Sequence, residues 1–348
     1  MLSESAPRTP VQTPETAMKA LVLHGKEDLR FEERPVPSPG PGEVLLEIGS
    51  VGVCGSDKHF YFEGRVSSEV VTDPLVLGHE FGGRIIGLGT GVPASRLGER
   101  VSVEPLMPDW SSKEAREGRY NIDPSQKFFG VPGTDGALQQ YLVAPSENAY
   151  PIPDSVSDDA AAMVETISVS LNGVRKANLG LGSRVLITGG GPIGLFAAQL
   201  SLLHGATSVT VVEPQQSRRA AAADYGCDVV ADLAEVDNSH DALLECTGVQ
   251  AVRHDACLKL FPGGKAVFIG VGAQDAAVPM PAVIEREVSI VGVMRYAFTW
   301  PSVIRALAAG RLDADGLVTR RLRFDRALEA WTHPDVTEVK TMIHVREQ

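Results

Sequence analysis

Short apolar runs bounded by Pro and Gly fill the chain from Met18 to about Val143. The runs are four to six residues long, which is typical of β-strands and too short for helices. The Pro and Gly residues between them indicate turns. We expect strands at residues 19–23, 43–48, 84–88 and 100–103. This part of the chain is therefore predicted to form an irregular, mostly β domain.

The pattern changes after Pro153, where longer helical segments begin to alternate with apolar strands. Residues 158–177 are rich in Ala and are expected to be helical, and further helices are expected to begin near Pro192 and Gln215. The expected strands lie at residues 184–188, 208–212, 242–246, 266–269 and 288–291. Strands that alternate with helices predict a parallel sheet.

These changes divide the chain into four predicted segments. Residues 1–17 are rich in Pro, Ser and Thr and have few bulky apolar side chains, so we expect a disordered tail. We expect residues 18–157 to form the first part of one domain and residues 158–293 to form a second domain around the parallel sheet. Residues 294–348 are mixed in pattern and are expected to cross back and complete the first domain. A chain of 348 residues is long enough for two hydrophobic cores.

Composition and charge exclude several function classes. The net charge of −12 and the lack of a Lys/Arg run disfavour nucleic-acid binding. No apolar stretch approaches the ~20 residues of a membrane span, and no signal sequence is evident, so a cytoplasmic location is expected. Only four cysteines occur and none are closely paired, which predicts neither a disulfide framework nor a Cys-rich zinc knuckle.

A glycine motif follows the strand at residues 184–188 and begins the next helix. Its residues Gly189, Gly191, Pro192, Ile193 and Gly194 are predicted to bind a cofactor pyrophosphate through backbone N–H groups and the helix N-terminus. The alternative is a Gly-rich turn without a ligand.

A carboxylate follows the next strand, because Glu213 lies 24 residues after Gly189. It is placed to accept hydrogen bonds from the two ribose hydroxyls of NAD, and it would repel the 2′-phosphate of NADP. Arg218, also a candidate cofactor-binding residue, and Arg219 leave NADP open as the alternative.

Three neighbouring ligand types suggest a metal site. Cys54 and the pair His79 and Glu80 follow two predicted strands, and zinc accepts S, N and O ligands. Taken alone, a Cys is more often a small buried hydrophobe and a His an ordinary core or surface residue. Glu165 lies in an apolar helical run, where a buried carboxylate would need a cation or a donor. An exposed Glu is the simpler reading of Glu165.

Together these residues resemble the zinc-dependent medium-chain dehydrogenase/reductase superfamily, and within it the sorbitol dehydrogenase branch of polyol dehydrogenases. The likeness runs from about Met18 to Val345. It rests on the segments GVCGSDKH (52–59), GHEFGG (78–83), VETISV (164–169), the glycine motif, MRY (294–296) and TWP (299–301). The resemblance implies an α/β two-domain fold, with a GroES-like, mostly β catalytic domain and a Rossmann domain built on a doubly wound parallel sheet.

The resemblance also implies one catalytic zinc per subunit, held by Cys54, His79 and Glu80, with Glu165 as a ligand or as a contact of the zinc-bound water. A second, structural zinc site is not expected, because the four close cysteines of the wider superfamily are missing from residues 104–121. The family further implies a homo-oligomer, either a tetramer or a dimer.

The resemblance also assigns catalytic and substrate roles to further residues. Ser56 is expected to accept the substrate proton and His59 to pass it to solvent, the alternatives being a capping Ser and a solvated His. Substrate hydroxyls are expected to bind Arg295 and Tyr296, although Arg295 could instead form an interdomain ion pair. Phe128, and with it Phe129, is expected to form an apolar wall.

The predicted function is zinc-dependent oxidation of a polyol secondary hydroxyl to a ketose, with hydride transfer to NAD. One alternative is an alcohol or vicinal-diol dehydrogenase of the butanediol type. A second alternative, outside enzymes, is a silent nucleotide-binding relative that kept only the fold.

Overall fold

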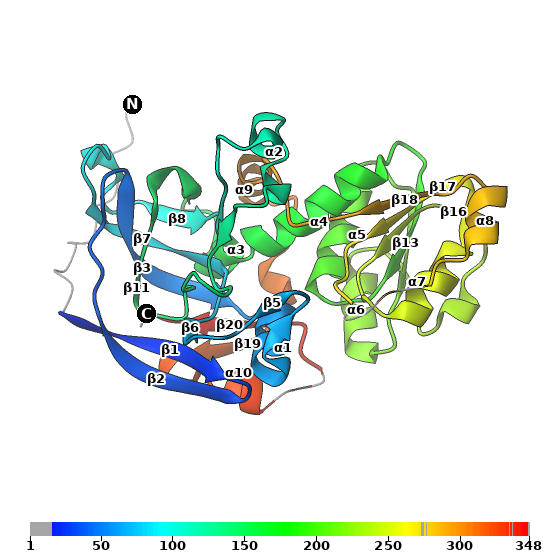
Figure 1. Ribbon diagram of the computed structural model, residues 1–348. Coiled ribbons are helices and arrows are strands. Elements are labelled where there is room, and N and C mark those ends of the chain that lie inside the picture. Colours follow the sequence, from blue (N-terminus) through cyan, green and yellow to red (C-terminus); the bar gives the residue numbers. More distant parts are fainter. Residues whose placement is uncertain (1–15, 273–274, 276, 334, 336, 347–348) are drawn as a thin grey trace.

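The computed structural model describes residues 16–346 except 273, 274, 276, 334 and 336. Two lobes lie side by side, with helix α4 (Val164–Ala177) between them (Figure 1). One lobe is built on a mixed sheet and the other on a parallel sheet. The predicted two-domain α/β fold is confirmed. Most of the predicted tail, residues 1–15, lies outside the described residues, and its last residue, Ala17, begins strand β1.

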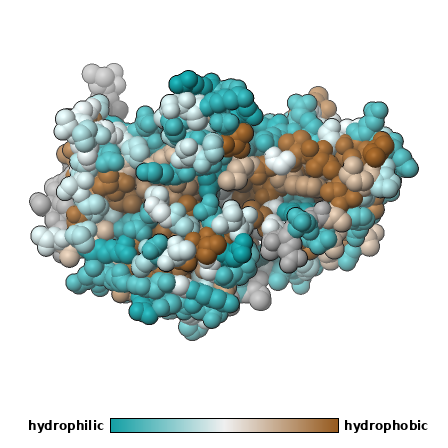
Figure 2. Space-filling view, viewed as in Figure 1, coloured by the Kyte–Doolittle hydropathy of each residue, from teal (hydrophilic) through white to brown (hydrophobic). Residues whose placement is uncertain are grey.

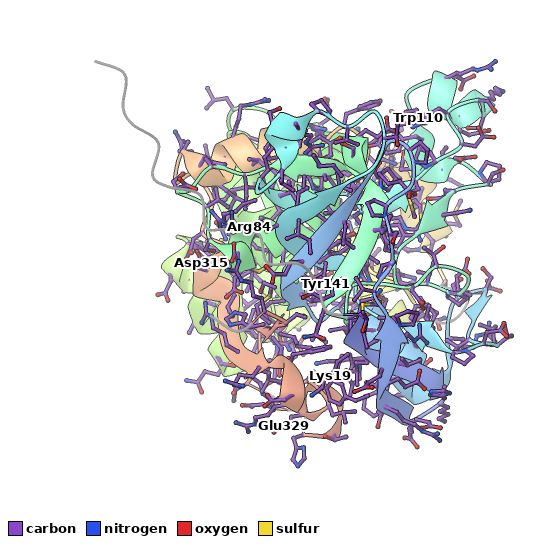
Figure 3. All side chains as sticks on the ribbon, turned by 90° about the vertical axis from the view of Figure 1, so that its left-hand side faces the viewer. Lys19, Arg84, Trp110, Tyr141, Asp315 and Glu329 are labelled. Atoms are coloured by element: carbon purple, nitrogen blue, oxygen red, sulfur yellow. The ribbon has the colours of Figure 1, made fainter. Side chains whose placement is uncertain are left out.

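The main sheet of the first lobe has the strand order β12-β8-β7-β3-β20-β19, and β11 also pairs with β3. Its strands are β3 (Glu43–Gly52), β7 (Glu80–Leu88), β8 (Arg100–Val103), β11 (Tyr141–Pro145), β12 (Ala149–Pro151), β19 (Val318–Arg323) and β20 (Lys340–His344). The chain returns to this sheet at its end, because β20 pairs with β3. Figure 3 views this lobe from its outer side, and its labelled Arg84 and Tyr141 lie on β7 and β11, which both pair with β3.

Three smaller sheets complete this lobe. They are formed by β1 (Ala17–Gly25), β2 (Asp28–Pro35) and β6 (Leu75–Val76), by β4 (Arg65–Val66) and β5 (Glu69–Val70), and by β9 (Leu106–Met107) and β10 (Lys127–Phe128). Its helices are α1 (Gly55–Glu63), α2 (Lys113–Arg116), α3 (Asp158–Ala162) and α10 (Glu329–Thr332).

The second lobe contains a six-stranded parallel sheet with the order β15-β14-β13-β16-β17-β18. Its strands are β13 (Arg184–Thr188), β14 (Ser208–Val212), β15 (Asp228–Val230), β16 (His240–Glu245), β17 (Leu260–Phe268) and β18 (Ser289–Gly292). The helices of this lobe are α5 (Pro192–Leu203), α6 (Gln216–Asp224), α7 (Gln250–Cys257) and α8 (Met280–Glu285). Helix α9 (Trp300–Ala308) lies with the first lobe, where it packs against α4 and its Trp300 Nε1 donates to Ser102 Oγ of β8 (Figure 1). This strand order reverses direction between β13 and β16, as in a doubly wound dinucleotide-binding sheet.

Both faces of the parallel sheet are covered. Along β13, Val185 and Ile187 join the hydrophobic cluster on the α5 side, whereas Leu186 joins the cluster that contains Ala256 and Cys257 of α7. Burial on both faces explains why its strands are continuous apolar runs, without polar alternation. None of the described helices is long and apolar enough to cross a membrane.

Helix α3 corrects the predicted domain boundary. The Ala-rich pattern placed it with the parallel sheet, but it packs on β3, β7 and β8 of the mixed sheet. Its Asp159 accepts hydrogen bonds from Ser50 Oγ (2.5 Å) and Arg321 Nε (2.8 Å) of that sheet. The mixed-sheet lobe therefore extends past residue 157, and α4 is the first helix to pack against the parallel sheet.

Candidate active site

Three potential metal ligands converge at one end of the mixed sheet. Cys54 follows β3 and precedes α1, whereas His79 and Glu80 lie at the start of β7. Strands β3 and β7 are antiparallel neighbours, and Gly52 is opposite Glu80. The Cys sulfur, a His ring nitrogen and a carboxylate oxygen lie within 4.8 Å of one another. Sheet pairing therefore brings together ligands that are about 25 residues apart in the sequence.

A buried carboxylate ties the two ligand-bearing loops together. Asp57 is 1% exposed and accepts hydrogen bonds from the backbone N–H groups of Cys54 (2.9 Å) and Gly78 (3.3 Å). Gly78 has a φ of 92°, and a Cβ there would lie 2.9 Å from Val51 Cγ1. Glycine is thus required at the turn before His79.

His79 is buried beside negative charge. Its Nδ1 lies 3.6 Å from Asp57 Oδ1 and has no hydrogen-bond partner among the described residues. Burial alone would lower the pKa of His79, but the neighbouring Asp57 and Cys54 outweigh it and raise this pKa to about 10. A cation beside the ring would replace the bound proton, because only a neutral imidazole can ligate a metal.

Glu80 has a partner that the sequence analysis missed. Lys340, the first residue of β20, is 2% exposed, and its Nζ donates to Glu80 Oε2 and to the Val53 carbonyl oxygen (3.1 Å). Burial would raise the pKa of Glu80, but Lys340 and His79 together lower it. The available signal was a Lys at the start of a short, mostly buried strand, with Val339 before it and Met342 and Ile343 after it.

Glu165 faces the same cluster from the first turn of α4. The side chain is buried, and desolvation with the nearby Glu80 raises the pKa of Glu165 to about 7, against the opposing effects of His79 and Tyr296. Tyr296 is fully buried and interacts electrostatically with Glu165. A buried carboxyl with a raised pKa is stabilised in its charged form when a cation binds beside it.

The site therefore fits the expected zinc ion. Cys54, His79 and Glu80 supply S, N and O donors of the kind that zinc accepts, and Glu165 lies beside them. Among the described parts of the chain, no other group of three such ligand atoms converges in this way.

The two residues assigned to proton transfer lie on helix α1. Ser56 is half-buried in the first turn, two residues after Cys54. His59 is exposed, and its Nδ1 lies 2.7 Å from Glu63 Oε1 of the same helix. Exposure thus rises from Ser56 to His59 along the helix, and the catalytic roles of both residues stay predictions.

The predicted substrate residues separate into two groups. The Phe128 ring lies 5.5 Å from the His79 ring, and the Arg295 guanidinium carbon lies 3.8 Å from the Phe128 centroid. Phe129, in contrast, packs edge-on against Phe81 in the core of the mixed sheet. Phe128 can therefore form a wall near the metal ligands, and the expectation for Phe129 is corrected.

The glycine motif lies where β13 meets α5. Gly189 has a φ of 93°, and a Cβ on Gly194 would overlap the Gly189 carbonyl oxygen. Gly191 has open space around it and precedes Pro192 and Ile193 in the first turn of α5. The open backbone N–H groups at this helix N-terminus can bind a pyrophosphate.

Glu213 closes this loop from the end of β14. The carboxylate is buried and accepts hydrogen bonds from the N–H groups of Gly190 (2.7 Å) and Gln215 (2.9 Å). Arg219 donates to the Glu213 carbonyl oxygen, and Arg218 donates to the Glu338 carbonyl oxygen (2.8 Å) of the other lobe. The structure thus uses both arginines in protein contacts, and the cofactor role of Arg218 stays a prediction.

Comparisons with known proteins agree with this geometry. The family model "Alcohol dehydrogenase GroES-like domain" matches residues 40–154, and "Zinc-binding dehydrogenase" matches residues 192–309. Sorbitol dehydrogenase of Gallus gallus is 39% identical over 325 residues, covering 90% of this chain and 92% of that protein.

Solved structures extend the likeness to the whole fold. The 2R,3R-butanediol dehydrogenase of Bacillus subtilis has a TM-score of 0.85 at 28% identity, covering 94% of this chain and 100% of that chain. A dehydrogenase of Sinorhizobium meliloti 1021, described as zinc-binding and bound to NADP, has a TM-score of 0.89 at 26% identity. The match covers 95% of this chain and 100% of that chain. The similarity includes both lobes and is not confined to the nucleotide-binding half.

Proposed function

Because this chain belongs to the zinc-dependent medium-chain dehydrogenases, in the sorbitol dehydrogenase branch, we propose that it oxidises a polyol secondary hydroxyl to a ketose with NAD. The family makes it an oxidoreductase of CH–OH groups that uses zinc and a nicotinamide cofactor. The observation that carries the finer proposal is the position of Arg295 on Phe128, beside His79 of the ligand cluster.

The chemistry that zinc supplies when bound is polarisation of the substrate hydroxyl, so that its proton can leave near neutral pH. In our proposal Cys54, His79 and Glu80 hold one ion per subunit, and Glu165 contacts it directly or through water. Ser56 accepts the proton, and the exposed His59 passes it to solvent. The buried Phe128 excludes water from one side of the reacting carbon.

The polyol preference rests on the hydrogen-bond donors near this cluster. A guanidinium offers up to five donors, and a site that donates to several hydroxyls rejects analogues without them. Arg295 and the buried Tyr296 are the proposed donors to the hydroxyls next to the reacting carbon.

The preference for NAD rests on Glu213. Its buried carboxylate stands at the end of β14, beside the glycine loop, where a ribose would bind and a 2′-phosphate would be repelled. The Sinorhizobium meliloti 1021 structure is bound to NADP, and comparing kcat/KM for NAD and NADP tests the proposed preference.

A homo-oligomer is part of the proposal. Strand β18 pairs with β17 on one side, and no described strand pairs with its other side. Ile290 of this strand and Met280 and Ile284 of α8 are exposed. Figure 2 shows hydrophobic side chains gathered on the face of this lobe, and an open, apolar strand edge is suited to pairing with a second copy.

A substrate panel tests the proposed function. The zinc-loaded enzyme is assayed with C4 to C6 polyols, 2,3-butanediol and 2-butanol, each with NAD and NADP, by following the absorbance of the reduced cofactor. The highest kcat/KM is expected for a polyol with NAD. A clear preference for 2,3-butanediol would replace the proposal with the vicinal-diol function of the Bacillus subtilis neighbour, and turnover of no alcohol would support the silent nucleotide-binding relative.

A further inference from the structure

The main chain at Arg295 is fixed by two amide side chains. Arg295 has a φ of 45°, in the left-handed region that residues with a Cβ rarely adopt. Asn172 Nδ2 of α4 donates to the Arg295 carbonyl oxygen (2.8 Å), and Asn121 Nδ2 donates to that of Met294 (2.7 Å). With the backbone fixed, the direction of the guanidinium depends on the contacts of the side chain itself.

Those contacts come from one short segment just before and within β10. Arg295 Nη1 donates to Gln126 Oε1 (2.6 Å), while the guanidinium carbon lies 3.8 Å from the centroid of the Phe128 ring. The stacking contact fixes the distance of the group from the ring, and the hydrogen bond fixes its rotation over the ring. The other guanidinium N–H groups donate to no acceptor among the described residues, so they are available to a ligand.

Gln126 is itself held in one orientation. Its Nε2 donates to the Asn121 carbonyl oxygen (3.3 Å), which leaves Oε1 to face Arg295. The acceptor is uncharged, so Arg295 keeps its full positive charge, whereas a carboxylate here would form a competing ion pair. A neutral acceptor therefore orients the guanidinium without neutralising it.

We propose that Gln126 is a positioning residue for substrate specificity, which directs the free donors of Arg295 toward the hydroxyls beyond the reacting carbon. This inference rests on the proposed polyol function. Gln126 neither lies in the metal cluster nor touches the reacting atoms, and it acts through Arg295. Its effect should therefore appear with a polyol substrate and be nearly absent with a simple secondary alcohol.

The experiment is a double-variant cycle with Gln126→Met and Arg295→Ala. Gln126→Met keeps the side-chain length but removes both the acceptor for Arg295 and the donor to the Asn121 carbonyl oxygen. We expect Gln126→Met to raise KM for the best polyol by about 10-fold, as for loss of an oriented charge-assisted hydrogen bond, with kcat changed less. The kcat/KM for 2-butanol should change less than about 2-fold, and Gln126→Met should have no further effect in the Arg295→Ala background. Gln126→Glu, which retains an acceptor, should give an intermediate KM.

Zinc content, thermal midpoint and KM for NAD are measured for every variant, and all three should match the unmodified enzyme. Equal losses on the polyol and on 2-butanol, or additive effects of the two substitutions, would overturn the inference and leave the proposed function standing. An unmodified enzyme that prefers 2,3-butanediol would overturn the proposed function and the inference together.

Discussion

The two lobes assemble their sites in different ways. In the parallel-sheet lobe, the glycine motif and Glu213 lie within 25 residues of each other and directly follow the adjacent strands β13 and β14. In the mixed-sheet lobe, the cluster joins Cys54, His79 and Glu80 to Lys340, and Glu80 and Lys340 are 260 residues apart in the sequence.

The chemistry of the two sites differs accordingly. The cofactor site is made mainly of backbone N–H groups at a turn, which persist when a side chain changes. The metal site is made of buried charges that neutralise one another across distant segments. We therefore expect changes at the metal site to affect catalysis and stability strongly, and changes at the cofactor site to affect selectivity more than folding.

The largest effect is expected for loss of a metal ligand. Cys54→Ala removes the sulfur ligand, so zinc content should fall from about one ion per chain toward zero. Turnover should drop by about three orders of magnitude or more, since a Lewis acid contributes several kcal/mol to stabilisation of the transition state. Elemental analysis and steady-state kinetics measure both, and two tightly bound zinc ions in the unmodified protein would contradict the single site.

The next effect concerns the buried ion pair of Lys340 and Glu80. Lys340→Met removes the ion-pair partner of the buried Glu80 carboxylate and leaves His79 as its remaining positive neighbour, so the unfolding free energy of the metal-free protein should fall by as much as roughly 3–5 kcal/mol. Zinc beside Glu80 should reduce this loss, and the matched control Lys340→Met/Glu80→Gln should recover much of it. Urea unfolding with and without a chelator gives the comparison, and a loss well below about 1 kcal/mol would show that the pair is not stabilising.

A pH dependence is expected from Glu104, which is also buried in the mixed-sheet lobe. Burial raises the pKa of Glu104 from 4.5 to about 7, although the hydroxyls of Tyr120 (2.6 Å) and Tyr150 (3.2 Å) donate to it and lower this pKa. The folded state binds the proton more tightly than the unfolded state, so this group makes stability fall as pH rises from about 4.5 to 7. The fall should approach about 3 kcal/mol.

The matched variant is Glu104→Gln, which does not titrate. The difference in unfolding free energy between the two proteins isolates the contribution of Glu104, because the contributions of all other titratable groups are the same in both and cancel. That difference should shift in favour of the variant as pH rises from 4.5 to 8. Parallel stability curves would show that Glu104 titrates normally.

The smallest effect is expected at the cofactor site. Glu213→Ala leaves the N–H groups of Gly190 and Gln215 without their acceptor, so stability should fall by about 1–3 kcal/mol while the chain still folds and keeps its zinc. The preference for NAD over NADP should narrow by about 10- to 100-fold, as for loss of hydrogen bonds to a charged group. The ratio of kcat/KM for the two cofactors measures it. Equal or better kcat/KM with NADP in the unmodified enzyme would refute the role of Glu213.

The sequence by itself determined much of the parallel-sheet lobe. The strands predicted at residues 184–188 and 208–212 match β13 and β14, and the helix predicted near Pro192 begins there. These elements could be predicted because apolar runs, turn glycines and helix starts are local signals. A sheet that is buried on both faces has continuous apolar strands, which makes those strands easy to recognise.

Only the tertiary structure decided how distant segments meet. Resemblance to a family predicted Cys54, His79 and Glu80 as metal ligands, but the position of Lys340 among apolar residues did not show that Glu80 is its partner. The Ala-rich pattern of α3 is compatible with packing on either lobe. The sequence also could not show that Phe128 lies near His79 while Phe129 packs in the core. Pairing of β20 with β3, and packing of helices on one sheet or the other, depend on contacts between residues far apart in the chain, which local propensity does not encode.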